Sequence, residues 1–235
     1  MLQATDTTPP GVVLPSAPMP HHTPRLWDIS PPVDALTPAF PGDTAYSQTW
    51  VATLGPGCPV NVSALTLSPH LGAHADAPLH YDPAGLAVGM LDLVPFLGPC
   101  RVIHAINPGP RVLPHHLAAA LNRPAPLPPR VLVRTYTRMP QREWDGRLSA
   151  LAPETVELLA DLGVLLVGID TASIDPADSK TLDSHQVIRR RGLRVLENLV
   201  LDDVPEGDHE LIALPLKLTT ADASPVRAVL RALPG

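Results

Sequence analysis

Eleven residues in the first third of the chain contain four side chains that commonly bind metal ions. His70, His74, Asp76 and His80 follow the spacing H-x3-H-x-D-x3-H. Neutral imidazole and carboxylate oxygen are the ligands that zinc and similar divalent ions prefer in catalytic sites. One such histidine alone would more often be a buried or surface residue without a metal. Four ligand-type residues at this density favour a metal site.

The backbone around these residues does not favour a helix. Pro69 and Pro78 bracket the run, and Gly72 lies between the first two histidines. Residues 60–68, VNVSALTLS, alternate between polar and apolar side chains as a strand does. The sequence therefore predicts a strand over residues 60–68 that leads into a tight, irregular loop carrying the four residues.

Length and composition indicate one globular domain. The chain has 235 residues, of which 45% are hydrophobic, so a substantial core is expected. Residues 1–24 are rich in proline and predict a flexible leader, whereas residues 25–235 show no repeat and no domain boundary. We therefore expect a single domain over residues 25–235.

Charge and targeting signals exclude several functional classes. The net charge of −6 gives no electrostatic case for binding nucleic acid or an anionic membrane. No apolar stretch reaches the ~18 residues of a membrane span, and the N-terminus lacks the pattern of a secretory signal. Cys58 and Cys100 could pair, but two thiols in a chain of this length are more typical of a reducing compartment. We expect a cytoplasmic protein.

Strands and helices are predicted in both halves of the chain. Residues 164–169, VLLVGI, are wholly apolar and predict a central strand buried on both faces. Pro215 within residues 210–218 predicts an edge strand or a bulge. The other predicted elements are strands over residues 26–30, 101–106 and 130–137, and helices over residues 114–122 and 152–162.

Aromatic residues are scarce, so each one is a candidate for a particular role. Phe40, Tyr46 and Trp50 lie close together in sequence and could form a wall for a flat substrate or fill the core. The sequence does not decide between these two roles. Trp144 lies in a polar stretch, where an exposed indole would need a reason.

Four polar residues in the second half of the chain are further candidates. Asp170 and Thr171 follow the predicted central strand, where polar residues either line a site or cap the next turn. His185 and Glu197 lie twelve residues apart in otherwise apolar or basic surroundings.

Seven separated blocks resemble the cyclase family of metal-dependent hydrolases and, within it, the bacterial arylformamidases. They are LWDISPPV, PGDT, LTLSPHLGAHADAPLHYD, LGPCRVIH, VGIDTASIDPADSKTLDSH, LENLVLDDVPEGDHELIALPLKL and ASPVRAVLRALP. The histidine-rich run joined to a distant His-x11-Glu is the most specific feature. The resemblance implies an α/β fold in a single domain, with a mixed β-sheet core and outer helices of the swivelling β/α/β type, and a homodimer.

The resemblance also implies two zinc ions, with manganese as the alternative. His70 and His74 match ligands of one metal, and Asp76 matches the carboxylate that bridges both. His185 and Glu197 match the ligands of the second metal.

Two further residues match positions with assigned roles. His80 matches the residue that transfers protons, and Phe40 matches an aromatic residue that contacts the substrate. The chain departs from the family at Leu71, where a small polar residue is common, and after Trp144, where an expected aromatic residue is missing.

The implied reaction is hydrolysis of the small molecule N-formyl-L-kynurenine to L-kynurenine and formate. A dinuclear metal site supplies the nucleophile and stabilises the oxyanion, and a histidine supplies the proton for the leaving nitrogen. Absence of a G-x-S-x-G motif disfavours a serine hydrolase. The alternatives are hydrolysis of another amide or of a cyclic imide such as isatin, and a catalytically silent metal-binding protein.

Overall fold

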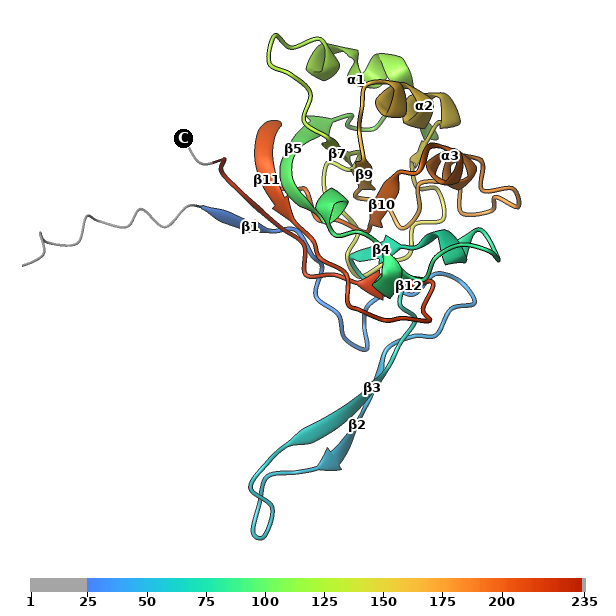
Figure 1. The fold of residues 1–235 in the computed structure, drawn as a ribbon. Helices are drawn as coiled ribbons and strands as arrows, with labels where there is room; N and C mark the ends of the chain where they lie inside the picture. Colours follow the sequence, from blue (N-terminus) through green and yellow to red (C-terminus); the bar gives the residue numbers. More distant parts are fainter. Residues whose placement is uncertain (1–24, 234–235) are drawn as a thin grey trace, which may run out of the picture.

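A curled, nine-stranded mixed sheet forms the centre of the structure (Figure 1). The computed structural model describes residues 25–233. The nine strands are β1 (Leu26–Asp28), β4 (His74–Asp76), β5 (Leu97–His104), β7 (Arg130–Arg134), β9 (Leu166–Ile169), β10 (Arg194–Glu197), β11 (Gly207–Ile212), β12 (Ala223–Pro225) and β13 (Val229–Arg231). Their order across the sheet is β1-β13-β11-β5-β7-β9-β10-β4-β12. The four central strands β5, β7, β9 and β10 are parallel, and the flanking pairs are antiparallel.

The remaining elements are short. The α-helices are α1 (Pro114–Leu121), α2 (Pro153–Asp161) and α3 (Asp183–Arg191). Three 3-10 turns are η1 (Pro78–His80), η2 (Val88–Met90) and η3 (Val94–Phe96). Two small sheets pair β2 (Ser47–Ala52) with β3 (Val62–Thr66), and β6 (Arg111–Val112) with β8 (Ala150–Leu151).

Hydrophobic side chains cover both faces of the central strands. Val131 and Val133 of β7 pack with α1, α2 and α3, whereas Leu132 between them packs on the opposite face. Val195 and Leu196 of β10 divide between the two faces in the same way. This alternation is expected, because successive side chains of a strand point to opposite faces. The helices therefore cover one face of the sheet, and loops with antiparallel strands cover the other.

The predicted mixed α/β fold is confirmed. The predicted central strand over residues 164–169 corresponds to β9, whose four residues are all buried between β7 and β10. The helices predicted over residues 114–122 and 152–162 form with nearly the predicted bounds. Helix α2 begins at Pro153, and the backbone leaves the helix at Gly163, which has a positive φ of 83°.

Two local predictions are wrong. The strand expected over residues 210–218 ends at Ile212, before Pro215, and it lies between β5 and β13 rather than at an edge. The irregular loop expected to carry all four candidate ligands contains a strand, β4, at His74–Asp76. This strand forms because both of its neighbours, β10 and β12, supply backbone partners for the segment between Pro69 and Pro78.

The hairpin of β2 and β3 projects from the body as an arm (Figure 1). The predicted strand over residues 60–68 is confirmed for Val62–Thr66, but all five of its residues are exposed, so its alternation does not mark a buried face. Cys58 near the tip of the arm and Cys100 in the core are both free. The predicted flexible leader, residues 1–24, lies outside the described residues. Each helix within residues 25–233 is too short or too polar to span a bilayer.

A close backbone approach holds η1, which ends at His80. The amide of Leu79 donates to the carbonyl of Leu86 at 3.2 Å, and this contact brings Gly85 against the backbone of Pro78. A Cβ atom at Gly85 would overlap the carbonyl group of Pro78 and lie 2.6 Å from the nitrogen of Leu79. Only glycine fits here without moving the backbone.

We expect Gly85→Ala to destabilise the protein by about 1–3 kcal/mol, the usual cost of overpacking a site that cannot relax. Thermal unfolding would measure this as a lower Tm. Gly55→Ala is the matched control, because a Cβ atom there meets nothing within 4 Å and the residue has no positive φ. Equal Tm values for the two variants would contradict the prediction.

Candidate metal centre

The register of β4 and β10 places three candidate ligands on one face of the sheet. His74 and Asp76 are two residues apart on β4, so their side chains point to the same face. Glu197, the last residue of β10, is the direct cross-strand partner of His74. Ala75 points to the opposite face and packs in the core there. The three polar side chains therefore lie on the helix-covered face, at the carboxyl end of β10.

His70, His74 and Asp76 form the first group of candidate ligands. The Oδ1 atom of Asp76 lies 3.0 Å from Nδ1 of His70 and 3.3 Å from Nε2 of His74. His70 reaches this position because the chain reverses at Gly72, which has a φ of +71°. The sequence spacing H-x3-H-x-D therefore closes into one compact cluster.

His185, Glu197 and Asp76 form the second group. Helix α3 brings His185 over the sheet, where its Nε2 atom lies 3.2 Å from Oδ2 of Asp76 and 3.5 Å from Oε1 of Glu197. Asp76 thus turns one carboxylate oxygen to each group. All five metal-ligand candidates predicted from the sequence converge here, from segments more than 100 residues apart.

Unpaired buried atoms test whether this centre fits a metal ion. Nε2 of His74 and Oδ1 of Asp76 are buried, and although oppositely charged neighbours lie 3.0–3.3 Å away, neither atom has a partner with hydrogen-bond geometry among the described residues. Each such orphaned atom costs about 1–3 kcal/mol. A divalent cation would satisfy both atoms at once, and imidazole nitrogen with carboxylate oxygen is a suitable donor set for zinc. The residues therefore fit a metal.

Two histidines have the outer ring nitrogen fixed by a hydrogen bond. Nδ1 of His74 donates to the carbonyl oxygen of Gly72 at 2.9 Å, and Nδ1 of His185 donates to Oδ2 of Asp175 at 2.7 Å. Asp175 itself is held by the backbone amides of Ser184 and His185. In both rings Nε2 is left for a metal. Sequence reasoning missed Asp175, which sits within a family block but carries no signal in its spacing.

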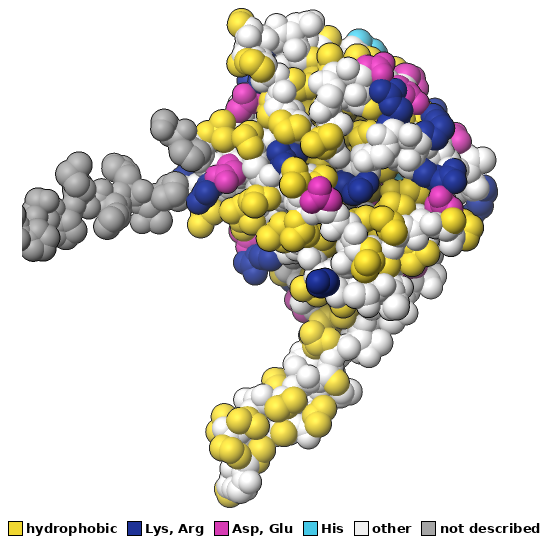
Figure 2. Space-filling view, in the orientation of Figure 1, with side chains coloured by type: hydrophobic (Ala, Val, Ile, Leu, Met, Phe, Trp, Pro, Cys, Tyr) yellow, Lys and Arg dark blue, Asp and Glu magenta, His cyan; other side chains and the backbone are white. Residues whose placement is uncertain are grey.

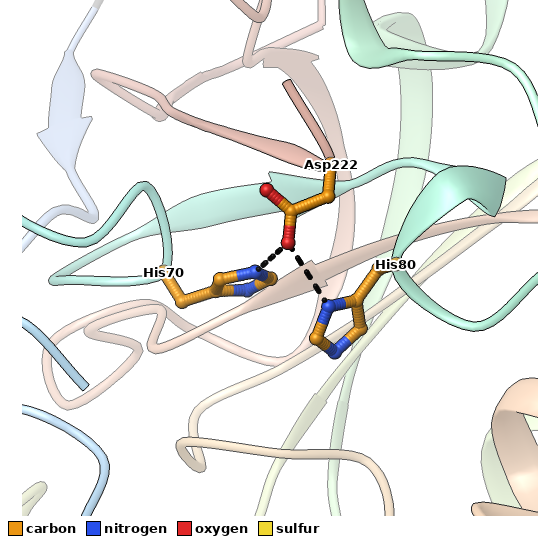
Figure 3. Close-up of side chains that lie close together, drawn as sticks. All are labelled: His70, His80 and Asp222. Atoms are coloured by element: carbon orange, nitrogen blue, oxygen red, sulfur yellow. Dashed lines mark hydrogen bonds and ion pairs between the residues drawn. The ribbon is translucent and has the colours of Figure 1, made fainter. Parts of the chain in front are cut away.

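Asp222 was also missed by sequence reasoning, and it joins two of the predicted residues. Its Oδ2 atom lies 3.0 Å from Nε2 of His70 and 3.3 Å from Nδ1 of His80 (Figure 3). These three residues form a third group that could hold a cation. Asp222 comes from the loop before β12, and no local pattern singles it out. His80 therefore lies beside the first group, but its Nδ1 contacts Asp222 rather than Asp76.

The centre opens into a cavity of about 300 Å³. The ring of Phe40 lines the cavity and packs edge-to-face on Trp144, with 4.9 Å between ring centroids. Tyr46 and Trp50 lie outside the cavity, and Trp50 is 59% exposed, so neither forms a wall or fills the core. Leu71 is buried and does not line the cavity. Trp144, which the sequence left unexplained, completes the aromatic wall.

Asp170 lines the same cavity and has a structural role. Its carboxylate accepts hydrogen bonds from the backbone amides of Thr135 and Tyr136 and from the Thr135 hydroxyl. Burial raises the pKa of Asp170 to about 6 despite these hydrogen bonds. The hydroxyl of Thr171 donates to the carbonyl of Ser173 and so stabilises the following turn.

Without a metal, the neighbouring carboxylates raise the pKa of both buried histidines. Burial by itself lowers the pKa of His74, but its contacts with Asp76 and Glu197 outweigh burial and raise it to about 10. Burial is likewise outweighed at His185, where Asp175 and Asp76 raise the pKa to about 10. In the metal-free centre, His74 and His185 therefore hold protons near neutral pH. These protons supply the positive charge that a bound metal would otherwise supply beside the carboxylates.

The family model for cyclases matches residues 27–176, more than half of the chain. The chain belongs to the cyclase family. The resemblance noted in the sequence is thereby confirmed.

One relative of this cyclase-family chain is a kynurenine formamidase from Paracidovorax citrulli (strain AAC00-1). It is 75% identical over 212 residues, which cover 89% of this chain and 98% of the relative. A solved structure from Bacillus stearothermophilus, described as a predicted metal-dependent hydrolase, is 26% identical with a TM-score of 0.74 and covers 89% of this chain and 98% of its own. Isatin hydrolase A from Labrenzia aggregata is 22% identical with a TM-score of 0.77, and the match covers 88% of this chain and 93% of the hydrolase. The similarity to isatin hydrolase shows the fold alone.

We expect the apparent metal affinity of this centre to rise with pH between about 6 and 9. The raised pKa values mean that His74 and His185 hold protons below about pH 10, and a metal must displace them. Each displaced proton adds about tenfold in affinity per pH unit. Competition with a chelator of known pH dependence would measure the slope. His115→Gln, at an exposed position on α1, should keep that slope, and a pH-independent affinity in the parent protein would contradict the prediction.

Proposed function

We propose that this protein hydrolyses N-formyl-L-kynurenine to L-kynurenine and formate, the arylformamidase step of tryptophan degradation. The observation that carries the proposal is a cluster of three histidines and two carboxylates at the base of a cavity with an aromatic wall. The 75% identity to a kynurenine formamidase over most of both chains supports the same substrate. Hydrolysis of isatin is not favoured, because the isatin hydrolase is related only distantly.

We further propose that the centre holds two zinc ions. His70, His74 and Asp76 would hold one ion, and Asp76, His185 and Glu197 the other. When bound, a pair of divalent ions activates water as a nucleophile and polarises the formyl oxygen. Asp76 suits the shared position because its two oxygens already face different histidines.

His80 is the proposed proton-transfer residue. It lines the cavity, and its side chain is 32% exposed, so it is accessible to substrate. Asp222 accepts the Nδ1 proton of His80, which leaves Nε2 of the neutral ring unprotonated. That nitrogen can take a proton from the attacking water and return it to the leaving aniline nitrogen. Asp222 would fix both the tautomer and the position of the ring.

Phe40 and Trp144 form the proposed binding surface for the aryl ring of the substrate. The formyl group is small and needs little space beside the metal ligands. An edge-to-face or stacked aromatic contact contributes about 0.5–1.5 kcal/mol beyond the burial of area. Contact of the aryl ring with Phe40 and Trp144 would therefore position the formamide at the metal centre, in addition to holding the substrate in the cavity.

The arm supports a homodimer. Residues 44–69 contain no Asp, Glu, Lys or Arg, and Figure 2 shows the projecting arm as yellow and white. Six large hydrophobic side chains on it are exposed: Trp50, Val51, Leu54, Val60, Val62 and Leu65. A two-stranded hairpin is marginal by itself, and an apolar projection of this kind is typical of an interaction surface. We propose that a second copy of the chain covers it, and that the protein acts in the cytoplasm, where its two cysteines stay reduced.

Purified, zinc-loaded protein should release formate from N-formyl-L-kynurenine, and a chelator should abolish the reaction. His80→Ala should retain the parent metal content and Tm while its rate falls roughly 10²–10⁴-fold, the usual contribution of general acid–base catalysis. Formate release and elemental analysis would measure the two effects separately. His115→Ala is the control and should keep both. Loss of metal in His80→Ala would make this residue a ligand, and absence of formate would refute the function.

Substitutions that introduce charged side chains on the arm should dissociate the proposed dimer. Trp50→Glu combined with Leu65→Glu would place two carboxylates on a surface that we propose is buried, so the protein should sediment as a monomer. Leu162→Glu, at a residue that is 48% exposed on the body after α2, should leave the dimer intact. Parent protein that sediments as a monomer would contradict the proposed dimer directly.

A further inference from the structure

Charged side chains other than metal-ligand candidates also line the cavity. They are Asp43, Glu143, Asp145, Asp170 and Lys180. Lys180 is the only lysine or arginine among the lining residues that the structure describes. An aryl ring and a formamide need no such charges. The cavity therefore has more charged side chains in its lining than hydrolysis of the amide bond requires.

Three of these carboxylates already have partners within the protein. Asp170 is held by the amides described above, and Asp43 accepts a hydrogen bond from the hydroxyl of Ser68 at 3.0 Å. Asp145 accepts the hydroxyl of Tyr136 at 3.0 Å. These three side chains therefore already form hydrogen bonds that hold the walls of the cavity together.

Lys180 and Glu143 differ from the other three. Neither side chain forms a hydrogen bond or an ion pair with any residue in the described part of the chain, although both line the cavity and both are exposed. Two charges of opposite sign are thus available at one cavity without being paired to each other. A zwitterionic group on a ligand would match this pair, with a carboxylate for the lysine and an ammonium group for the glutamate.

The position of Lys180 is tied to the metal centre through a short, fixed segment. The amide of Ser179 donates to the carbonyl of Pro176, and the amide of Leu182 donates to the hydroxyl of Ser179. Leu182 then takes a positive φ of 50°, an unusual conformation for this residue type, directly before α3 begins. Since α3 carries His185, the segment sets Lys180 at a defined place relative to a candidate ligand.

We propose that Lys180 binds the α-carboxylate of the substrate and that Glu143 binds its α-ammonium group. The pair selects aryl formamides that carry an amino-acid tail. This inference rests on the proposed function, because it assigns the groups that recognise the tail of N-formyl-L-kynurenine. The formamide then lies at the metal centre, the ring at Phe40 and Trp144, and the tail at the charged pair. The cavity of about 300 Å³ lies at the lower end of the range for small ligands, and both charged side chains are among the residues that line it.

The contribution of each charge is modest, because both side chains are exposed. An exposed ion pair changes a binding constant by roughly two- to fivefold. The effect should appear mainly in KM, because the tail is remote from the reacting atoms and binds equally in the ground and transition states. High salt should reduce the preference for the charged substrate by screening both contacts.

Three substrates and two variants test the proposal. N-formyl-L-kynurenine carries both charges, its decarboxylated analogue carries only the ammonium group, and formanilide carries neither. Lys180→Gln should lower kcat/KM for N-formyl-L-kynurenine about two- to fivefold relative to the other two substrates. Glu143→Gln should lower kcat/KM by a similar factor for both charged substrates relative to formanilide. Lys217→Gln changes an exposed lysine outside the cavity and should leave every ratio as in the parent protein.

The ratios of kcat/KM among the three substrates distinguish failure of the tail assignment from failure of the proposed function. Parent protein that hydrolyses all three substrates, with the same ratios in Lys180→Gln and Glu143→Gln, would overturn the tail assignment and leave the proposed function standing. Parent protein that releases formate from none of them would overturn both. A proportional loss on all three substrates would indicate damage to the fold or the metal centre and would also overturn the assignment. Lys180→Arg, which retains the charge, should restore at least part of the parent ratio.

Discussion

The carboxylate of Asp76 is the point on which the rest of the site depends. It is buried on β4, the strand next to one edge of the sheet, and an ionised group in such a place is costly unless neighbouring groups compensate. Its two oxygens face histidines from different segments, with His70 and His74 on one side and His185 on the other. The lack of a hydrogen-bond partner for Oδ1 within the described residues is tolerable if a cation takes that place. A cation bound at the Asp76 oxygens would therefore both stabilise the buried carboxylate and complete the proposed metal centre.

Strand pairing in the sheet fixes the position of the Asp76 carboxylate. Strand β4 inserts between β10 and β12, so each of its three residues has a strand partner on both sides even though the strand is short. The cross-strand partnership of His74 with Glu197 brings together ligands that are 123 residues apart in sequence by residue number. A loop could not hold such side chains as firmly, because loops have fewer backbone hydrogen bonds and open more readily.

A second set of residues holds the candidate ligands in position. Asp175 fixes His185, and Asp222 lies between His70 and His80. The segment that follows Asp175 also carries Lys180, so one stretch of chain places both a candidate ligand and a candidate substrate contact. In the proposed reaction, this arrangement would link recognition of the substrate tail to the metal centre.

The sequence by itself predicted the candidate residues of the site and determined much of the fold. The residue types, their spacing and the family blocks predicted His70, His74, Asp76, His185 and Glu197 as candidate ligands, and the structure brings these five residues together. Apolar runs with proline and glycine stops marked α2 and β9. These features are local, so they can be read from neighbouring residues.

Only the tertiary structure decided what depends on distant partners. A three-residue segment such as β4 becomes a strand because two other strands pair with it, and its own residues do not specify that. Asp175 and Asp222 gained roles through the residues that folding placed beside them. Residues 60–68 of the arm were predicted as a strand, yet the exposure of every residue of β3 depends on where the chain leaves the body. Local propensity determines what a segment can form, and long-range contacts determine what it meets.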